Sequence, residues 1–172
     1  LRPELAVTDV FQLTIIAAYG VVQALGRASG APLKIKWPND LVVVDGNRLI
    51  KVGGILTETR IQGNVVAGAV VGVGVNWENL VPESGACLKT FSRRNLDLAM
   101  VAAAVLGGLE DSYYLWRERG IGRIVTGYER ARDEAALGRL EAAVSALPPP
   151  SEPPPLALAD HELALLFHAV PD

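Results

Sequence analysis

Three extended segments separated by short turn signals constrain the fold of this chain more than any other feature. They are Leu41–Val44, Leu49–Thr59 and Val65–Asn76. Asp45-Gly46-Asn47 and Gln62-Gly63-Asn64 stand between them, and glycine beside aspartate or asparagine is typical of a hairpin turn. A further extended segment, Leu33–Trp37, ends at Pro38 because proline has no amide hydrogen to donate to a sheet. The sequence therefore predicts an antiparallel meander, and the continuous valine and alanine content of its last strand predicts burial on both faces.

Two longer segments show helical periodicity. In Val10–Leu25 the apolar residues recur at helical spacing, Thr8 or Asp9 is placed to cap the helix, and Gly26 and Gly30 are placed to end it. Leu96–Trp116 has a similar pattern. Helices of this kind bury one face, so we expect them to pack on the sheet, and the predicted fold class is α+β.

The second helix and the end of the chain set the expected domain organisation. Asn95 is placed to cap the helix that follows it. The prolines between residues 148 and 155 predict an extended, exposed segment. We therefore expect a folded core over residues 1–127 and a divergent alanine- and proline-rich tail over residues 128–172.

Composition excludes several classes of function. A chain of 172 residues with 50% hydrophobic and 20% charged residues can bury one core. Its net charge of -3 argues against nucleic-acid binding, which needs clustered lysine and arginine. No apolar run reaches the ~20 residues of a membrane span. Cys87 is a single cysteine, so it forms no internal disulfide and a cytoplasmic location is expected. Its spacing from His161 and His168 predicts no metal site.

Glycines inside strands suggest that a ligand approaches the backbone. Gly53 and Gly54 lie in one predicted strand, and Gly72 and Gly74 lie in the next. A glycine inside a strand costs stability and often marks close approach of another group. A flat ligand lying on these two strands accounts for both pairs. The pattern Gly72-Val73-Gly74 is not a dinucleotide-binding fingerprint, because Trp77 stands where the third glycine is required.

Polar residues gather where these strands begin. Asn39 and Asp40 follow the strand break, and Lys51 lies on the return strand. Lys51 offers a positive charge to a carboxylate or phosphate, and Asp40 can orient or deprotonate an amine nucleophile. Asn39 and Asn76 add neutral donors and acceptors. The set suits activation of a carboxylic acid by a nucleotide followed by acyl transfer. Taken singly, Lys51 also fits a solvated edge residue and Asp40 a turn residue.

Three motifs resemble those of the biotin protein ligases in sequence, order and spacing. They are Lys36-Trp37-Pro38-Asn39-Asp40-Leu41, Lys51-Val52-Gly53-Gly54-Ile55-Leu56-Thr57-Glu58 and Val71-Gly72-Val73-Gly74-Val75-Asn76. The resemblance covers roughly Leu1–Gly122. It implies a core similar to class II aminoacyl-tRNA synthetases, with helices on a mixed, largely antiparallel sheet. It also implies two reactions: biotin and magnesium-ATP form biotinyl-adenylate, which then acylates a lysine of a biotin carboxyl carrier domain. A homodimer is compatible with the resemblance.

The resemblance also assigns roles to individual residues. Lys51 would contact the biotin carboxylate and then the adenylate phosphate, and Asp40 would serve attack by the amine. The floor beneath biotin and the ribose would be formed by Gly54, Ile55, Gly72 and Gly74. Asn39 and Asn76 would lie on the nucleotide side.

Two departures from the family pattern lead to further expectations. The family has a Gly-Arg-rich adenylate-binding loop upstream of the Leu-Arg-Pro that opens this chain. We therefore expect the chain by itself to be nearly inactive, since losing a preorganised donor costs about 10²–10³ in rate. Members of the family often end in a small β-barrel. The segment 131–172 lacks the alternation of apolar and polar residues that such strands show. The alternatives are a non-catalytic module that binds biotin or a nucleotide, and a lipoate ligase-like acyltransferase.

Overall fold

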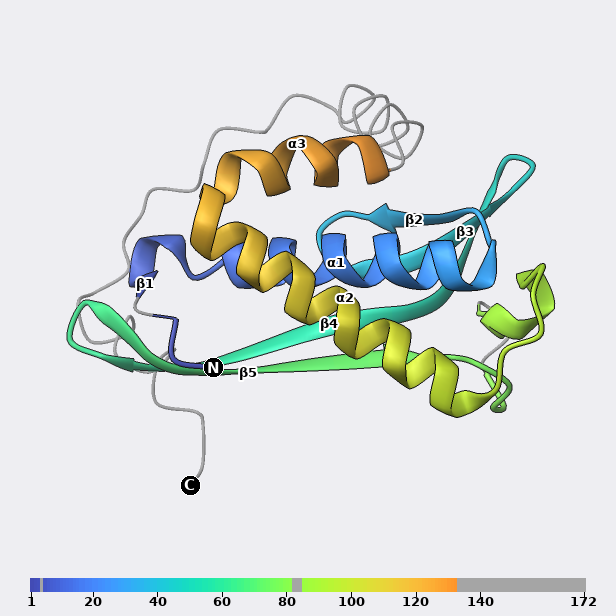
Figure 1. Ribbon diagram of the computed structural model, residues 1–172, viewed down its shortest axis with the longest axis horizontal. Coiled ribbons are helices and arrows are strands. Elements are labelled where there is room, and N and C mark those ends of the chain that lie inside the picture. The colour runs from blue at the N-terminus through green and yellow to red at the C-terminus, as the bar shows by residue number, and fades with distance from the viewer. Residues whose placement is uncertain (4, 82–84, 133–172) are drawn as a thin grey trace, which may run out of the picture. The chain divides into compact units, whose positions relative to one another are not determined.

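The described residues form one curled antiparallel sheet with helices on it. The computed structural model describes residues 1–3, 5–81 and 85–132. The five strands are ordered β1-β5-β4-β3-β2 (Figure 1). Their bounds are β1 Leu5–Ala6, β2 Leu33–Lys36, β3 Asp40–Asp45, β4 Arg48–Gln62 and β5 Val65–Val75. All pairs of neighbouring strands are antiparallel, and isolated parallel bridges join Ile35 to Arg132 and Lys51 to Gly85.

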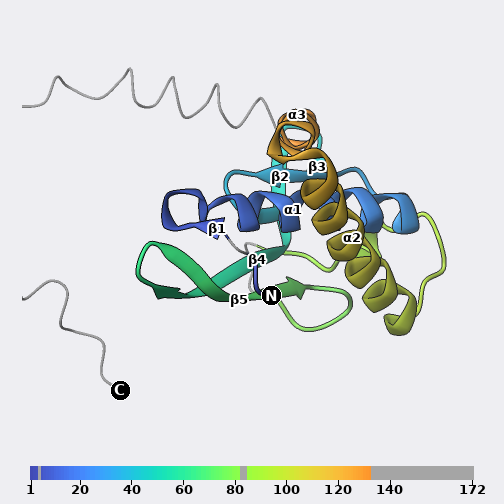
Figure 2. The same ribbon diagram turned by 60° about the vertical axis from the view of Figure 1, so that its left-hand side comes forward.

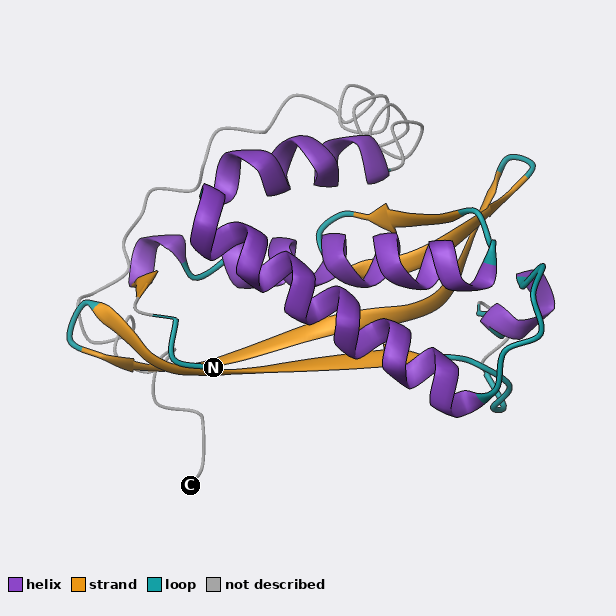
Figure 3. Ribbon diagram, in the orientation of Figure 1, coloured by secondary structure: helices purple, strands orange, loops and turns teal. Residues whose placement is uncertain are grey.

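The predicted meander is confirmed, and the long β4–β5 hairpin dominates it (Figure 3). Gly46 and Gly63 occupy the two hairpin turns with φ of 58° and 61°. This left-handed conformation costs glycine little because it has no Cβ atom. The turn residues therefore fix both registers, and the strand bounds lie within a few residues of those expected.

Helices α1 (Gln12–Ser29), α2 (Leu98–Arg119) and α3 (Ile121–Ala131) lie on the same side of the sheet (Figures 1 and 2). The short 3₁₀ helices η1 (Val7–Asp9) and η2 (Leu88–Phe91) connect the elements. The predicted stop at Gly26 is wrong, because α1 continues through it. The helix ends at Gly30, which has φ of 70° and donates its amide to Gly26 O.

Both predicted N-caps are wrong. Phe11 stands at the N-cap of α1 with no side-chain hydrogen bond, because Thr8 and Asp9 are used in the preceding 3₁₀ turn. Asp97, two residues after Asn95, caps α2 and accepts a hydrogen bond from the Met100 amide at 2.7 Å.

The core lies between the sheet and the helices. Leu25 of α1, Ile35 of β2, Leu41 of β3 and Ile55 of β4 are all fully or almost fully buried there. The expected burial of both faces of β5 is wrong, because Val70 is 68% exposed on the face away from the helices. Valine and glycine alternate along this strand. The face away from the helices therefore carries few large side chains that would need to be buried.

The core continues past the boundary expected after residue 127. Helix α3 spans that position, and its Tyr128 and Ala131 belong to the core. The physical reason is that Ile124, Tyr128 and Ala131 recur on one helical face and bury it. The expectations for the prolines at 148–155 and for His161 and His168 lie outside the described residues.

One described segment, Val7–Ser29, is long and apolar enough to cross a membrane by length and composition. In this fold its helix α1 packs on the sheet and on α2. Buried residues such as Ala18, Val21 and Leu25 belong to the common core.

Helices α1 and α2 approach each other most closely at two glycines. A Cβ atom on Gly108 would overlap the Gly20 carbonyl and come within 2.7 Å of the Ala24 Cβ. We expect Gly108→Ala to lower the free energy of unfolding by about 1–3 kcal/mol, because the packed backbones have no room to yield. Gly107→Ala is the matched control, since its Cβ would meet nothing within 4 Å. There alanine should stabilise the helix by up to about 1 kcal/mol. Urea unfolding of both variants measures the difference, and equal effects would contradict this account of the crossing.

Candidate active site

A row of four residues crosses the sheet on the face away from the helices. Lys36 pairs with Asp40, Asp40 with Gly54, and Gly54 with Gly74. Residues directly opposite each other on antiparallel strands point to the same face. Ile55, the next residue along β4, is buried in the core, so the row lies on the opposite face. The row thus joins a cation, a carboxylate and two bare backbone positions.

A β-bulge brings Lys51 to the same face. Leu41 pairs with Gly53 but Val42 pairs with Lys51, so Val52 is an extra residue on β4. Strict alternation along a strand would put Lys51 on the face of Gly53 and Ile55, among the helices. The extra residue reverses that orientation, as bulges beside active sites do. The Lys51 Cε consequently lies 3.9 Å from the position that a Cβ on Gly54 would occupy.

Asp40 is shared by two lysines. The Lys51 Nζ lies 2.5 Å from Asp40 Oδ1, and the Lys36 Nζ lies 3.9 Å from Oδ2. The Asp40 side chain is 23% exposed and that of Lys51 is 54% exposed. Ion pairs this accessible to water contribute little to stability. An incoming anion can therefore replace Asp40 as the ionic partner of Lys51 at a small cost in free energy. The Asp40 carboxylate is then available to a second group.

Asn39 is fixed by two hydrogen bonds to one residue. The Ile55 amide donates to the Asn39 carbonyl at 2.9 Å, and the Asn39 Nδ2 donates to the Ile55 carbonyl at 2.6 Å. These bonds extend the β3–β4 ladder into the turn and hold the residue before Asp40. Asn76 lies beyond the end of β5, where its amide donates to the Val52 carbonyl at 2.8 Å. Both asparagines thus lie beside the middle of β4, next to the bulge at Val52.

The glycines divide between the two faces. Gly54, Gly72 and Gly74 lie on the open face, with Gly54 opposite Gly74 and Gly72 opposite Leu56. Gly53 faces the helices, where a Cβ would overlap the Gly74 carbonyl. Its absent side chain is therefore a packing requirement rather than part of a floor.

Ile55 is the predicted floor residue whose side chain points away from the floor. It is 2% exposed and belongs to the core between the sheet and the helices. Neighbouring residues of a strand face opposite sides of the sheet, so a ligand that lies over Gly54 cannot contact the side chain of Ile55. Ile55 contributes to this site through its backbone, which holds Asn39.

Two residues beside the site had no role in the sequence prediction. Lys36 is the second cation on Asp40. Tyr128 of α3 donates its hydroxyl to the Pro38 carbonyl at 2.7 Å. Burial raises the pKa of Tyr128 to about 12, against a lowering by the Arg132 charge, so the hydroxyl stays protonated at physiological pH. The signal available in the sequence was the seven-residue spacing of Ile121 and Tyr128, which places both residues on one face of a helix.

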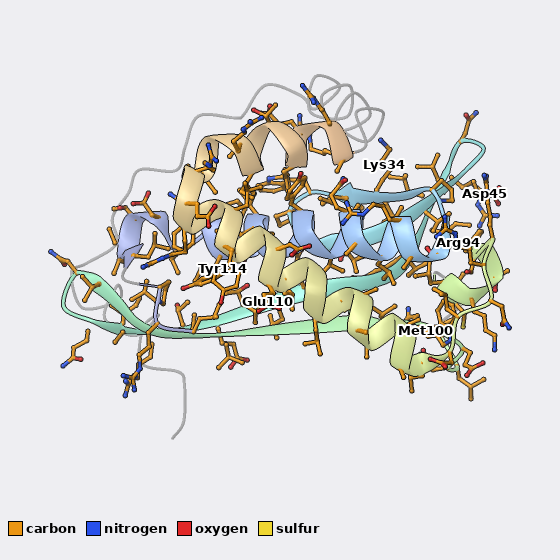
Figure 4. The ribbon with its side chains drawn as sticks, in the orientation of Figure 1. Lys34, Asp45, Arg94, Met100, Glu110 and Tyr114 are labelled. Carbon is orange, nitrogen blue, oxygen red and sulfur yellow. The ribbon has the colours of Figure 1, made fainter. Side chains whose placement is uncertain are left out.

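The site is a shallow surface, whereas a groove of about 680 Å³ lies on the helix side. Leu13 and Ile16 of α1, Val71 of β5 and Leu106 of α2 line it. Glu110 and Tyr114 of α2 also border it (Figure 4). Its lining is mainly apolar and lacks the paired charges of the open face. The paired charges of Asp40 and Lys51 therefore make the open face, rather than this groove, the candidate site.

Comparison with known proteins finds the same region of the chain. Residues 4–76 match the biotin/lipoate A/B protein ligase family. The chain is 42% identical over 88 residues to the biotin--[acetyl-CoA-carboxylase] ligase of Paracoccus denitrificans. It is 38% identical over 76 residues to the bifunctional ligase/repressor BirA of Bacillus subtilis. These matches cover 50% and 44% of this chain but 35% and 22% of the two relatives, so the chain spans about a fifth to a third of their length.

A solved relative has the same fold. The biotin protein ligase of Aquifex aeolicus superposes with a TM-score of 0.59 in its apo structure and 0.57 in complex with biotin and ATP. The sequence identity is 22%, and the matches cover 74% and 75% of this chain and 56% and 55% of that chain. The predicted fold class is thereby confirmed, including the mixed, largely antiparallel sheet packed by helices.

Proposed function

Since residues 4–76 match the biotin/lipoate A/B protein ligase family, we propose that this chain carries the catalytic core of a biotin protein ligase. The observation that supports this most is the Lys51–Asp40 pair beside the bare backbone of Gly54 and Gly74. A cation, a carboxylate and an open floor are the groups that carboxylate activation and amine acylation require. The proposed substrates are biotin, ATP as its magnesium complex, and a biotin carboxyl carrier domain.

In the first reaction a biotin carboxylate oxygen forms a bond to the α-phosphorus of ATP, and pyrophosphate leaves. The flat open face over Gly54, Gly72 and Gly74 lets the substrate lie against the backbone. Lys51 exchanges Asp40 for the substrate carboxylate and then faces the adenylate phosphate. Its charge is useful because negative charge accumulates on the oxygens around phosphorus in the transition state.

In the second reaction the lysine Nζ of the carrier domain forms an amide bond with the biotinyl carbonyl carbon, and AMP leaves. The amine must lose a proton as it attacks. Asp40 is placed to orient the amine and to accept that proton, because its carboxylate is released when Lys51 moves to the phosphate. Asn39 stands beside Asp40 and would serve the nucleotide, as would Asn76.

Magnesium enters this scheme with the nucleotide. Among the residues that the structure describes, no group of three His, Cys, Asp or Glu side chains is placed to hold a metal ion. Magnesium in nucleotide-dependent enzymes is commonly held by substrate phosphates with one or two carboxylates. We therefore treat it as part of the ATP substrate, with the cytoplasm as the proposed location of the reaction.

The test is transfer of biotin to a purified carrier domain by this chain with ATP and magnesium. Transfer is read with labelled streptavidin, and the Lys51→Ala chain defines the background. We expect slow transfer above that background and none when lipoic acid replaces biotin. Transfer of lipoate alone would instead identify a lipoate ligase. Tight binding of biotin by calorimetry without any transfer would identify a binding module.

The glycine floor gives a prediction that separates ligand contact from packing. A Cβ on Gly54 would have ordinary contacts of 3.6–3.9 Å with Asn39, Asp40 and Lys51. Gly54→Ala should therefore change the free energy of unfolding by no more than about 0.5 kcal/mol. It should weaken binding of a non-hydrolysable biotinyl-adenylate analogue by about 10–200-fold, because the methyl group occupies the space of the ligand.

Two glycine variants control this measurement. Gly53→Ala should instead lower the free energy of unfolding by about 1–3 kcal/mol, because its Cβ would overlap the Gly74 carbonyl and lie 3.1 Å from Leu41 Cδ1. Gly68→Ala, whose Cβ would come no nearer than 3.8 Å to Leu1 O, should leave both properties unchanged. Calorimetry and urea unfolding are run on all three. Unchanged affinity in Gly54→Ala would place the ligand elsewhere.

A further inference from the structure

Tyr128 connects the last turn of α3 to the turn that carries the candidate catalytic carboxylate. Its hydroxyl donates to the Pro38 carbonyl at 2.7 Å, across 90 residues of sequence. The side chain is 4% exposed, so water does not compete freely for this bond. The contact therefore joins a helix of the core directly to the β2–β3 turn.

The bonded carbonyl stands next to the site residues. The Pro38 carbonyl belongs to the peptide that continues into Asn39, and Asp40 follows. On its other side the turn is held by the reciprocal hydrogen bonds between Asn39 and Ile55. Hydrogen bonds therefore hold the turn on two sides, from β4 on one side and from Tyr128 on the other.

Other contacts of the same helix end hold β2 instead of the turn. Lys34 Nζ donates to the Arg130 carbonyl at 3.2 Å, and a backbone bridge joins Ile35 to Arg132 (Figure 4 shows Lys34 beside this end of α3). These contacts anchor the strand that leads into the turn. The Tyr128 hydroxyl adds a directional bond within the turn itself, one residue from Asn39.

We infer that Tyr128 is a positioning residue, whose hydroxyl fixes the Pro38 carbonyl and thereby sets the placement of Asn39 and Asp40 relative to Lys51 and Gly54. The kinetic part of this inference rests on the proposed function, whereas the structural part does not. A shift of the turn by a fraction of an ångström changes the approach of Asp40 to an amine. Misplacement of a catalytic group by 1 Å can cost about 10²-fold in rate.

The variant that tests this is Tyr128→Phe, which keeps the buried ring and removes one hydroxyl. Tyr19→Phe is the matched control, because Tyr19 of α1 packs its ring on Gly127 of α3, the residue before Tyr128. Hydrogen exchange of the Ile55 amide, which is bonded to Asn39, reports on the turn. The Val7 amide, bonded to the Asn64 carbonyl, reports on the opposite end of the β4–β5 hairpin. We expect Tyr128→Phe to accelerate exchange at Ile55 about fivefold and to leave Val7 unchanged.

The kinetic readout is transfer of biotin from added biotinyl-adenylate to the carrier domain. We expect Tyr128→Phe to lower its maximal rate about tenfold with the affinity for the adenylate nearly unchanged, and Tyr19→Phe to have no effect. Tyr128→p-aminophenylalanine restores an N–H donor, so it should recover both exchange protection and rate. It also keeps the test valid if Tyr128→Phe does not fold.

Three results would overturn the inference. They are wild-type exchange at Ile55 in a folded Tyr128→Phe, equal changes in both tyrosine variants, and failure of p-aminophenylalanine to restore protection at Ile55. Faster exchange at Ile55 together with no biotin transfer by the unmodified chain would remove the proposed function and leave the positioning role intact. The two hypotheses therefore fail in different measurements.

Discussion

Lys51→Gln is expected to lower the rate of biotin-dependent pyrophosphate exchange by about 10²–10³, the cost of removing one preorganised group that stabilises developing charge. Glutamine keeps an unbranched polar side chain, one atom shorter than lysine, and the backbone pairing with Val42, but it removes the cation. The side chain is half-exposed and its ion pair with Asp40 is accessible to water. The free energy of unfolding should therefore change by less than about 1 kcal/mol.

The control for Lys51 is another exposed lysine with an acidic partner. Lys89 forms an ion pair with Glu78 and takes no part in the row of Lys36, Asp40, Gly54 and Gly74. Lys89→Gln should leave pyrophosphate exchange at the level of the unmodified chain. If Lys51→Gln also retains full exchange activity, then Lys51 is a solvated surface residue and the site assignment fails. A parallel loss in both variants would point to a general effect of net charge.

Asp40→Asn is expected to lower the rate of transfer from preformed biotinyl-adenylate by about 10²–10⁴, the usual contribution of a positioned general base. Asparagine matches the shape of aspartate but cannot accept a proton from the attacking amine. The same change removes the partner of Lys51. Binding of the adenylate should therefore be maintained or improved, since the phosphate no longer competes with Asp40 for that lysine.

The control for Asp40 lies at the other end of the same strand. Asp45 ends β3 at the tip of the β3–β4 hairpin and is exposed (Figure 4). Asp45→Asn should change neither transfer nor adenylate binding. Single-turnover transfer, measured with saturating carrier domain, separates the chemical step from binding. Loss of adenylate binding with an unchanged transfer rate in Asp40→Asn would mean that Asp40 serves only to hold Lys51.

Much of the sheet was predictable because its signals are local. Gly46 and Gly63 adopt the positive φ that their turns require, and the β-branched residues between them form the strands. Helix starts were less predictable. Several residues before α1 and α2 can accept a capping bond, and the approach of the chain decides which one does, as Asp97 shows.

Helix α3 was missed because its glycines interrupt the helical pattern. Gly127 is covered by the ring of Tyr19, a residue of α1 that lies more than a hundred positions earlier in the sequence. That packing compensates for the low helix propensity of glycine. The role of Tyr128 was not predicted for the same reason. Tyr128 was assigned to the tail, and a tail residue is not expected to contact Pro38.

The sequence by itself determined the residue types of the candidate site and the order of the strands that carry them. Lys51, Asp40, Gly54, Gly72 and Gly74 were predicted from their spacing along a meander. Their common face was decided by the tertiary structure. The extra residue Val52 turns Lys51 toward Asp40, and the alternation beyond it sends Ile55 into the core. A bulge depends on the pairing of two strands, so it leaves no mark in the spacing of either strand alone.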